Sequence, residues 1–234
     1  MKYEMKGRIR FSEVDQQKRI TLPAIINYFQ DCSTFQSEEL GVGFKRLESH
    51  NKAWILSSWQ IIIERWSKFG EQITIATWAS DFQGIYGVRN FTMCDAEGNV
   101  AAYANSIWVY MDVETGRPCK PGEEQIKMYD MEPAFDMAYA PRKIKLPKEC
   151  QEGQAFPVRR YHIDTNGHVN NSQYVQMALE VMPEEISPRQ VRVEYKKAAV
   201  HGDIIVPKIA AEEARTVVEL CDESGKPFAV VEIV

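Results

Sequence analysis

The opening of the chain alternates between apolar and polar residues from Tyr3 to Phe11, which is the pattern of a half-buried strand. Apolar residues then recur at three- and four-residue spacing between residues 22 and 40. Thr21 is a good N-cap residue and Gly41 a good stop signal, so this stretch predicts a long helix with one apolar face. We expect that helix to bury its apolar face against a sheet.

Four strand-like runs follow the predicted helix, and each is rich in Ile, Val, Thr and aromatic residues. They cover residues 54–66, 72–82, 86–95 and 100–112. The order of one strand, one helix and four strands predicts an α+β unit in which the helix packs on a largely antiparallel sheet.

The second half repeats this plan with a strand, a polar loop, an amphipathic helix that Pro183 is expected to end, and four more strands. The strand-like runs cover residues 190–203, 204–213, 215–225 and 227–234. Short motifs also match in the same order: residues 14–15 (Val-Asp) with 163–164 (Ile-Asp), 70–71 (Gly-Glu) with 202–203 (Gly-Asp), and Cys-Asp-x-x-Gly at 94–98 with 221–225. These matches indicate an internal duplication.

A proline-punctuated stretch with little periodicity separates the two halves, from Pro118 to Pro157. We therefore predict a first domain over residues 1–130, an inter-domain linker over 131–154 and a second domain over 155–234.

The net charge of −5 argues against a general nucleic-acid-binding protein, which needs a broad basic surface. Between residues 142 and 160, however, six basic side chains stand against two acidic ones. This local excess is either an ordinary solvated face or a dock for an acidic partner.

The five cysteines show no metal-ligand spacing, and their odd number is typical of reduced thiols. No apolar run approaches the roughly 20 residues that a membrane span needs, and no signal-peptide pattern opens the chain. We expect a cytoplasmic protein with no membrane span, no metal and no cofactor. The oligomeric state stays open, because a fused pair of domains could replace a homodimer or could itself dimerise.

The polar loop of the second half, HIDTNGHVNN at residues 162–171, combines a carboxylate, an amide and an imidazole. If this loop is extended, the side chains of Asp164, Asn166 and His168 project to one side. His168 could act as a general base, with Asp164 orienting it and Asn166 holding a water or a carbonyl. The N–H groups at the start of the next helix could hold an oxyanion. Supporting positions are Gly167 for the turn and Asn170 and Asn171 for the helix cap.

Other interpretations of the loop are a simple turn with capping residues, or a metal site formed by His162, Asp164 and His168. The chain has no GxSxG serine motif and the loop has no cysteine, so attack by water fits better than a covalent intermediate.

The first copy of the loop lacks the amide–glycine–imidazole set. It has Gln-Lys-Arg at residues 17–19 where the second copy has Asn-Gly-His at 166–168. We therefore predict that only the second copy is catalytic. The first copy is then free to bind the substrate. Its five tryptophans suit an apolar pocket, although plain core packing explains them equally well.

The chain resembles the acyl-acyl carrier protein thioesterases of the bacterial type, which are related to the plant FatA and FatB enzymes. The resembling segments are residues 12–41 in the first half, and DTNGHVNN (164–171) and VEYKKAAVHGD (193–203) in the second. The pattern D-x-N-x-H-x-x-N is matched in full.

This resemblance implies a tandem hotdog fold, in which each half has a long helix wrapped by a curved antiparallel sheet. It implies that the protein hydrolyses the thioester between a fatty acyl chain and acyl carrier protein, a reaction of fatty acid biosynthesis. Asp164, Asn166 and His168 would be the catalytic residues, and the first hotdog would hold most of the acyl pocket. The carrier protein is acidic, so its dock would consist of basic residues: Arg142, Lys143, Lys145, Arg159, Arg160, Lys196 and Lys197.

One departure from the family pattern concerns Ala198. Relatives commonly carry glutamate at this position, three residues after the Glu-Tyr pair that this chain keeps at 194–195. Either His168 with Asp164 suffices, another acid enters the site, or the activity is weak. Two alternatives to the carrier-protein thioesterase therefore stay open: a hotdog thioesterase acting on acyl-CoA, and an acyl-binding module that does not catalyse.

Overall fold

The computed structural model describes residues 2–182 and 187–234, and the chain forms two compact units, Met1–Ala140 and Pro141–Val234. Pro183, expected to end the second long helix, lies outside the described residues. Within the described part, no helix is both long enough and apolar enough to cross a bilayer.

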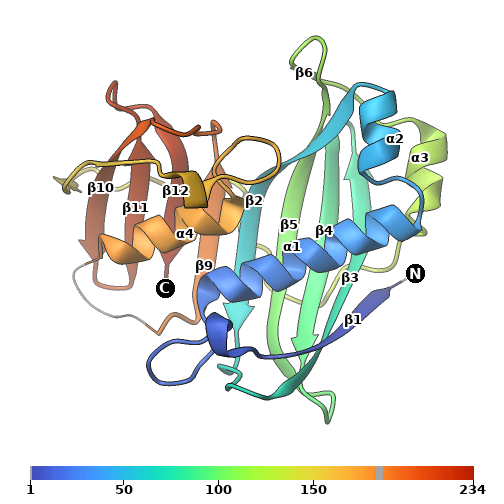
Figure 1. Cartoon of the computed structure of the whole chain (residues 1–234), viewed down its shortest axis with the longest axis horizontal. Helices are drawn as coiled ribbons and strands as arrows, with labels where there is room; N and C mark the ends of the chain where they lie inside the picture. The colour runs from blue at the N-terminus through green and yellow to red at the C-terminus, as the bar shows by residue number, and fades with distance from the viewer. Residues whose placement is uncertain (1, 183–186) are drawn as a thin grey trace. The chain divides into compact units, whose positions relative to one another are not determined.

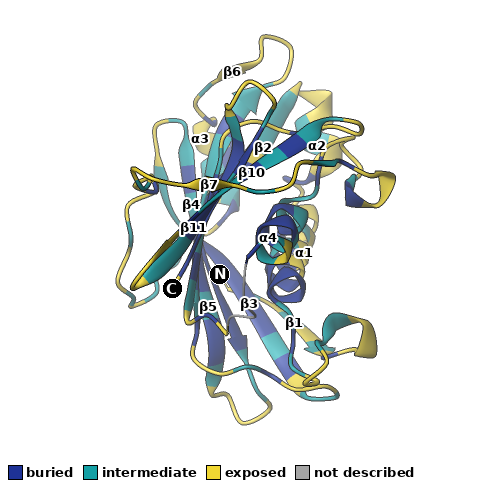
Figure 2. Cartoon of the chain, turned by 90° about the vertical axis from the view of Figure 1, so that its left-hand side faces the viewer, coloured by how far each residue is buried: buried dark blue, intermediate teal, exposed yellow. Residues whose placement is uncertain are grey.

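The first unit is built around α1 (Leu22–Glu39), which lies across the strands of its sheet (Figure 1). Thr21 caps this helix as predicted, because its Oγ1 accepts the N–H of Ala24 at 3.3 Å. The helix buries Phe29 against Phe91 and Trp59 of the sheet, with ring centroids 5.2 and 6.1 Å apart. Figure 2 shows that most of α1 is buried while the connecting loops are exposed.

The sheet of the first unit is antiparallel, with the order β1-β3-β4-β5-β2. Its strands are β1 (Tyr3–Arg8), β2 (Lys52–Ile63), β3 (Gln72–Gln83), β4 (Tyr86–Cys94) and β5 (Val100–Asp112), and the short β6 (Arg117–Pro118) pairs with β5. The four long runs of the sequence are therefore strands. Three short helices were not predicted: η1 (Phe11–Glu13), α2 (Phe44–Ser49) and α3 (Glu123–Met128).

The second unit has the same plan on a smaller scale, with α4 (Asn171–Glu180) lying across its strands (Figure 1). The strand order is β9-β12-β11-β10, with the short β7 and β8 both paired to β10. The elements are β7 (Gln151–Glu152), β8 (Phe156–Pro157), η2 (Arg160–His162), β9 (Gln190–Tyr195), β10 (Ile204–Glu212), β11 (Arg215–Cys221) and β12 (Pro227–Ile233).

The strand predicted over residues 190–203 is too long, because β9 ends at Tyr195. The N–H groups of Lys196 and Lys197 still donate to the C=O of Phe228 on β12, and the chain then leaves the sheet. The main chain of Ala199 bonds instead to the hydroxyl of Tyr174 on α4 and to the N–H of Val169, and both partners lie outside the sheet.

The two units confirm the duplication at the level of hydrogen bonds. The strand order β1-β3-β4-β5-β2 of the first unit corresponds, strand by strand, to the order β8-β10-β11-β12-β9 of the second. Asp95 and Asp222 make the same turn in the two copies of the Cys-Asp-x-x-Gly motif. Each carboxylate accepts the N–H groups two and four residues further on, at 2.8 to 3.1 Å.

The stretch that joins the two halves is ordered against each sheet. In the first unit it lies on the face opposite α1, because Asn90 and Gln60 point away from the helix side of their strands and hold it. The amide of Gln60 donates to the C=O of Ala138 at 2.9 Å and accepts the N–H of Ala140 at 2.8 Å. Asn90 accepts the N–H of Phe135 at 3.2 Å.

The beginning of the second unit is held in a similar way, on the face of its sheet opposite α4. Arg192 of β9 donates to the main-chain oxygens of Pro141 and Lys143. Glu194, two residues along the same strand, accepts the N–H of Ile144 at 3.1 Å. Ile144 is fully buried and packs with Val217 and Val230, so it completes the core on this face.

Candidate active site

The loop between η2 and α4 is a tight turn, so the one-sided projection of Asp164, Asn166 and His168 that an extended backbone would give does not occur. Asp164 donates its N–H to the C=O of His168 at 2.8 Å, and the N–H of Gly167 bonds back to the C=O of Asp164 at 3.1 Å. Ile163 and Val169 pair across the base of the turn. Gly167 has a φ of +76°, a conformation that glycine adopts without strain.

The carboxylate of Asp164 stabilises this turn from within. Its Oδ1 accepts the main-chain N–H of Asn166 at 2.8 Å and that of His168 at 3.4 Å. Among the described residues, Asp164 makes no hydrogen bond to the imidazole of His168. The carboxylate is half-buried, whereas the amide of Asn166 and the imidazole of His168 are exposed at the tip. Asp164 therefore shapes the backbone that carries the two exposed groups.

Asn170 caps α4, as the sequence predicts. Its Oδ1 accepts the N–H of Ser172 at 2.9 Å, and its C=O accepts the N–H of Gln173 at 2.9 Å. These two N–H groups are thus already paired and are not the oxyanion donors that the sequence suggested. The exposed side-chain amide of Asn166, which has no hydrogen bond in the described part of the chain, is the better donor toward a substrate oxygen.

Ala198 lies close to the loop along the hydrogen-bonded backbone. The next residue, Ala199, is buried and accepts the N–H of Val169 at 2.9 Å, and Val169 directly follows His168. The side chain at position 198 is exposed. A carboxylate introduced there would therefore stand one residue from the bond that ties this segment to the loop.

Glu194 cannot take the place of that missing carboxylate. Its side chain points to the face of the sheet opposite α4, because the neighbouring Tyr195 is the residue that faces the helix. The carboxylate is 3% exposed and is occupied by the N–H of Ile144 and by the ammonium of Lys196, the latter at 2.5 Å.

His162 is a structural residue of the turn that precedes the loop. It is buried, its Nδ1 accepts the N–H of Arg159 at 2.9 Å, and its C=O accepts the N–H of Asn170 at 2.9 Å. Burial and the charge of Arg159 lower the pKa of His162, so the imidazole is held neutral. The alternative metal site is not formed: in the described chain, His162, Asp164 and His168 are not grouped to hold an ion.

The first copy of the loop has the same hydrogen-bonded backbone but lacks the amide and the imidazole of the second copy. Asp15 accepts the N–H groups of Gln17 and Arg19, both at 2.8 Å, as Asp164 does in the second copy. Arg19, at the position of His168, places its Nε 3.1 Å from Asp15 and forms an ion pair with it. The turn is thus a property of the fold, and the exposed amide and imidazole are specific to the second copy.

The basic residues expected to dock a carrier protein fall into separate groups. Arg159 and Arg160 are exposed just before the loop at residues 162–171. The segment that holds Arg142, Lys143 and Lys145 crosses the face of the sheet opposite α4. The two lysines after β9 carry partners: Lys196 pairs with Glu194, and Lys197 with Asp222 at 3.4 Å.

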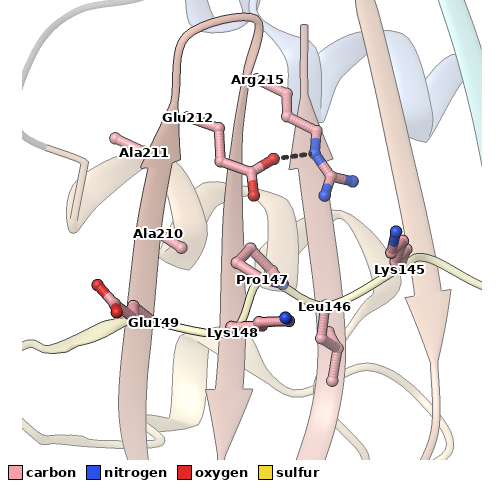
Figure 3. A pocket seen from close by; sticks show the side chains of 9 residues that line it. All are labelled: Lys145, Leu146, Pro147, Lys148, Glu149, Ala210, Ala211, Glu212 and Arg215. Carbon is pink, nitrogen blue, oxygen red and sulfur yellow. Dashed lines mark hydrogen bonds and ion pairs between the residues drawn. The ribbon is translucent and has the colours of Figure 1, made fainter.

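A shallow pocket of about 550 Å³ lies between residues 145–149 and the hairpin of β10 and β11 (Figure 3). Lys145 and Lys148 line it, and so does Arg215, which is paired with Glu212 at 2.7 Å. None of Asp164, Asn166 and His168 takes part in it, so this pocket is separate from the loop.

The two helix-on-sheet units form a double hotdog, and the turn of the second unit exposes an amide and an imidazole. A solved acyl-ACP thioesterase from Bacteroides thetaiotaomicron shares this fold with a TM-score of 0.92 at 22% identity, over 100% of this chain and 97% of that one. The 12:0-ACP thioesterase from Umbellularia californica gives a TM-score of 0.83 at 18% identity, over 99% and 96% of the two chains. The predicted α+β double hotdog is confirmed.

The chain belongs to the acyl-ACP thioesterase family. The family model of the acyl-ACP thioesterase N-terminal domain matches residues 1–129, and that of the C-terminal domain matches residues 138–232. A chloroplastic oleoyl-acyl carrier protein thioesterase of Arabidopsis thaliana is 26% identical over 226 residues, which cover 88% of this chain and 62% of the relative. The chain thus spans less than two thirds of the length of this plant relative.

Proposed function

We propose that this protein hydrolyses the thioester of fatty acyl-acyl carrier protein and releases a free fatty acid and the carrier. The observation that carries this proposal is the loop of the second unit, in which a hydrogen-bonded turn exposes Asn166 and His168 in the sequence pattern of the family. The first unit has the same turn but neither of these two groups.

His168 is the general base in the proposed reaction. It takes a proton from a water molecule as the water oxygen attacks the thioester carbonyl carbon. The amide of Asn166 donates to the carbonyl oxygen as negative charge develops on it. The C–S bond then breaks, and the imidazolium returns the proton to the departing sulfur, so that the products are a carboxylic acid and a thiol. Asp164 maintains the turn through its two main-chain hydrogen bonds.

The first unit is proposed to hold the acyl chain. The core beneath α1 is aromatic, with Phe29, Trp59 and Phe91 in mutual contact. The domain assignment that follows is acyl binding by the first hotdog and catalysis by the second.

The test is a release assay with carrier proteins loaded with short, medium and long acyl chains, compared with the CoA esters of the same chains. We expect faster release from the carrier esters, and a loss of at least about 10²-fold in kcat for His168→Ala. Faster release from CoA esters would identify an acyl-CoA thioesterase. Tight binding of acyl carrier without release would identify an acyl-binding module, which the alanine at position 198 would explain.

The carrier dock is proposed at Arg159 and Arg160, because these exposed cations lie at the start of the loop. The double variant Arg159→Glu/Arg160→Glu should raise KM for acyl carrier protein about tenfold and leave KM for acyl-CoA much less changed. Lys145→Glu/Lys148→Glu is the matched control, since it reverses the same charge in the pocket on the opposite face of the sheet. Equal effects of the two double variants would contradict this location.

A further inference from the structure

Three residues around the loop of the second unit are polar where the first unit has aliphatic residues. Around the loop, equivalent residues of the two units differ by 149 in residue number, as Asp15 and Asp164 do. Leu22 therefore corresponds to Asn171, and Ile25 to Tyr174. In the later strands the difference is 132, so that Ile63 corresponds to Tyr195. The duplication thus contains its own comparison between a loop that carries Asn166 and His168 and one that does not.

The two tyrosines make matching cross-links between α4 and the end of β9. The hydroxyl oxygen of Tyr174, on α4, accepts the N–H of Ala199 at 2.8 Å. The hydroxyl of Tyr195, the last residue of β9, donates to the C=O of Asn171 at 2.9 Å. The two rings contact edge to face, with centroids 5.8 Å apart. Helix and strand end are therefore tied in both directions.

These cross-links lead directly to the loop. Ala199, whose N–H is held by Tyr174, uses its own C=O to accept the N–H of Val169 at 2.9 Å. Val169 follows His168, and the turn closes through the bond between Asp164 and the C=O of His168. The other cross-link holds Asn171, the first residue of the helix that the loop enters. Hydrogen bonds thus connect Tyr174 through Ala199 to Val169, next to His168, and Tyr195 holds the first residue of the helix that follows the loop.

The fold itself does not require these hydroxyl groups. In the first unit, Ile20 donates its N–H to the C=O of Ser67 at 2.9 Å, which is the counterpart of the bond between Val169 and Ala199. This bond forms although Ile25 and Ile63 have no hydroxyl to offer. The hydroxyl groups are found only in the copy that carries the amide and the imidazole.

We infer that Tyr174 and Tyr195 are positioning residues, which hold the loop backbone so that His168 and Asn166 keep their places relative to the thioester. This inference rests on the proposed hydrolytic function. Positioning of this kind matters because small displacements of reacting groups lower the rate far more than they weaken substrate binding. Burial raises the pKa of Tyr174 to about 12 and that of Tyr195 well above its usual value, so both hydroxyl groups stay neutral.

The test compares Tyr174→Phe and Tyr195→Phe with the wild type, since each change removes one hydroxyl and keeps the ring. We expect kcat for acyl carrier protein, measured per folded protein, to fall about tenfold or more while KM changes little. Tm should also fall in Tyr174→Phe, because the buried N–H of Ala199 loses its partner. The acid limb of the pH profile of kcat/KM should shift, because the surroundings of His168 change. Tyr174→Ile, which copies the first unit, should give the same loss of kcat.

Tyr28→Phe is the matched control in the first unit. Tyr28 is also buried, and its hydroxyl donates to Glu13 at 2.7 Å and lies 3.1 Å from the C=O of Arg8. We expect this variant to keep kcat and the pH profile of the wild type. If Tyr174→Phe and Tyr195→Phe behave like the control, or lose kcat only in proportion to a loss of folded protein, the inference is overturned. A wild type that does not hydrolyse acyl carrier protein would instead overturn the proposed function.

Discussion

Lys18 and Gly167 occupy the same position in the two copies of the loop, and both have a left-handed backbone, with φ of +61° and +76°. A lysine pays for this conformation because its Cβ crowds the following carbonyl, at a cost of about 1 to 2 kcal/mol. Lys18→Gly should therefore raise the free energy of unfolding, by about 0.5 to 1 kcal/mol after the extra entropy of glycine in the unfolded chain is subtracted.

Urea unfolding measures this change, and the second copy offers the reverse experiment. Gly167→Ala introduces the same strain at the equivalent position and should lower the free energy of unfolding by about 1 kcal/mol. No Cβ contact complicates this change, since nothing lies within 4 Å of a Cβ built there. A loss of stability in Lys18→Gly would show that the two turns are not equivalent.

The pH dependence of stability should reflect His162. The pKa of this imidazole in the folded protein lies below its usual value, because burial and the charge of Arg159 disfavour its charged form. As the pH falls below that value, the unfolded chain takes up a proton before the folded chain does, and the free energy of unfolding decreases. The stability that neutral His162 contributes is fully present above the pKa of the unfolded chain. It is lost as the pH falls through the lower pKa of the folded protein. Thermal unfolding between about pH 5 and pH 7.5 measures this slope.

His162→Gln should flatten the slope, because an amide oxygen can accept the N–H of Arg159 at any pH in that range. If the wild type and His162→Gln show parallel curves, His162 does not couple protonation to folding.

Ala198→Glu should raise kcat for acyl carrier protein about tenfold or more, because a carboxylate next to the loop can assist in activating water. The position is exposed, so the new side chain has room, and Ala199 fixes the backbone beside it. Steady-state kinetics at neutral pH provides the measurement. Ala214→Glu, in the exposed turn between β10 and β11, adds the same charge away from the loop. A gain shared by both variants would reflect net charge alone.

Gln60→Leu should loosen residues 131–140, which lie on the face of the first sheet opposite α1. The change removes the Gln60 partner of the C=O of Ala138 and of the N–H of Ala140. Because Ala138 is exposed and Ala140 half-buried, the cost is about 1 kcal/mol in the free energy of unfolding. Limited proteolysis should also become faster within residues 131–140. Gln83→Leu is the control, since Gln83 is exposed and should change stability by less than about 0.5 kcal/mol. Unchanged cleavage in Gln60→Leu would refute the role of this amide.

Local features of the fold could be predicted from the sequence, because their causes lie within a few residues of one another. The side chain of Thr21 caps α1 through the N–H three residues away, and Asn170 caps α4 in the same manner. Alternation and β-branched content identified the long strands of both sheets. The repeat was readable because duplicated turns keep their aspartates, as Asp95 and Asp222 show.

Features that depend on partners far away in the sequence could not be predicted and are known only from the folded structure. The strand over residues 190–203 was predicted too long because Tyr174, which draws Ala199 away from the sheet, comes 25 residues earlier. The Asn-Gly pair indicates a turn in the loop, but no sequence pattern shows that Asp164 would turn its carboxylate to the main chain of Asn166 and His168.

The two helix-on-sheet copies, the loop that differs between them and the residue types available for chemistry could all be read from the amino-acid sequence. How that loop is held became visible only in the folded chain: Asp164 shapes it from within, and Tyr174 and Tyr195 hold it from the neighbouring helix and strand. The difference arises because propensity and capping act over one or two turns of chain. A hydrogen bond between a helix and the end of a strand forms only after both have packed, and its partners leave no local pattern.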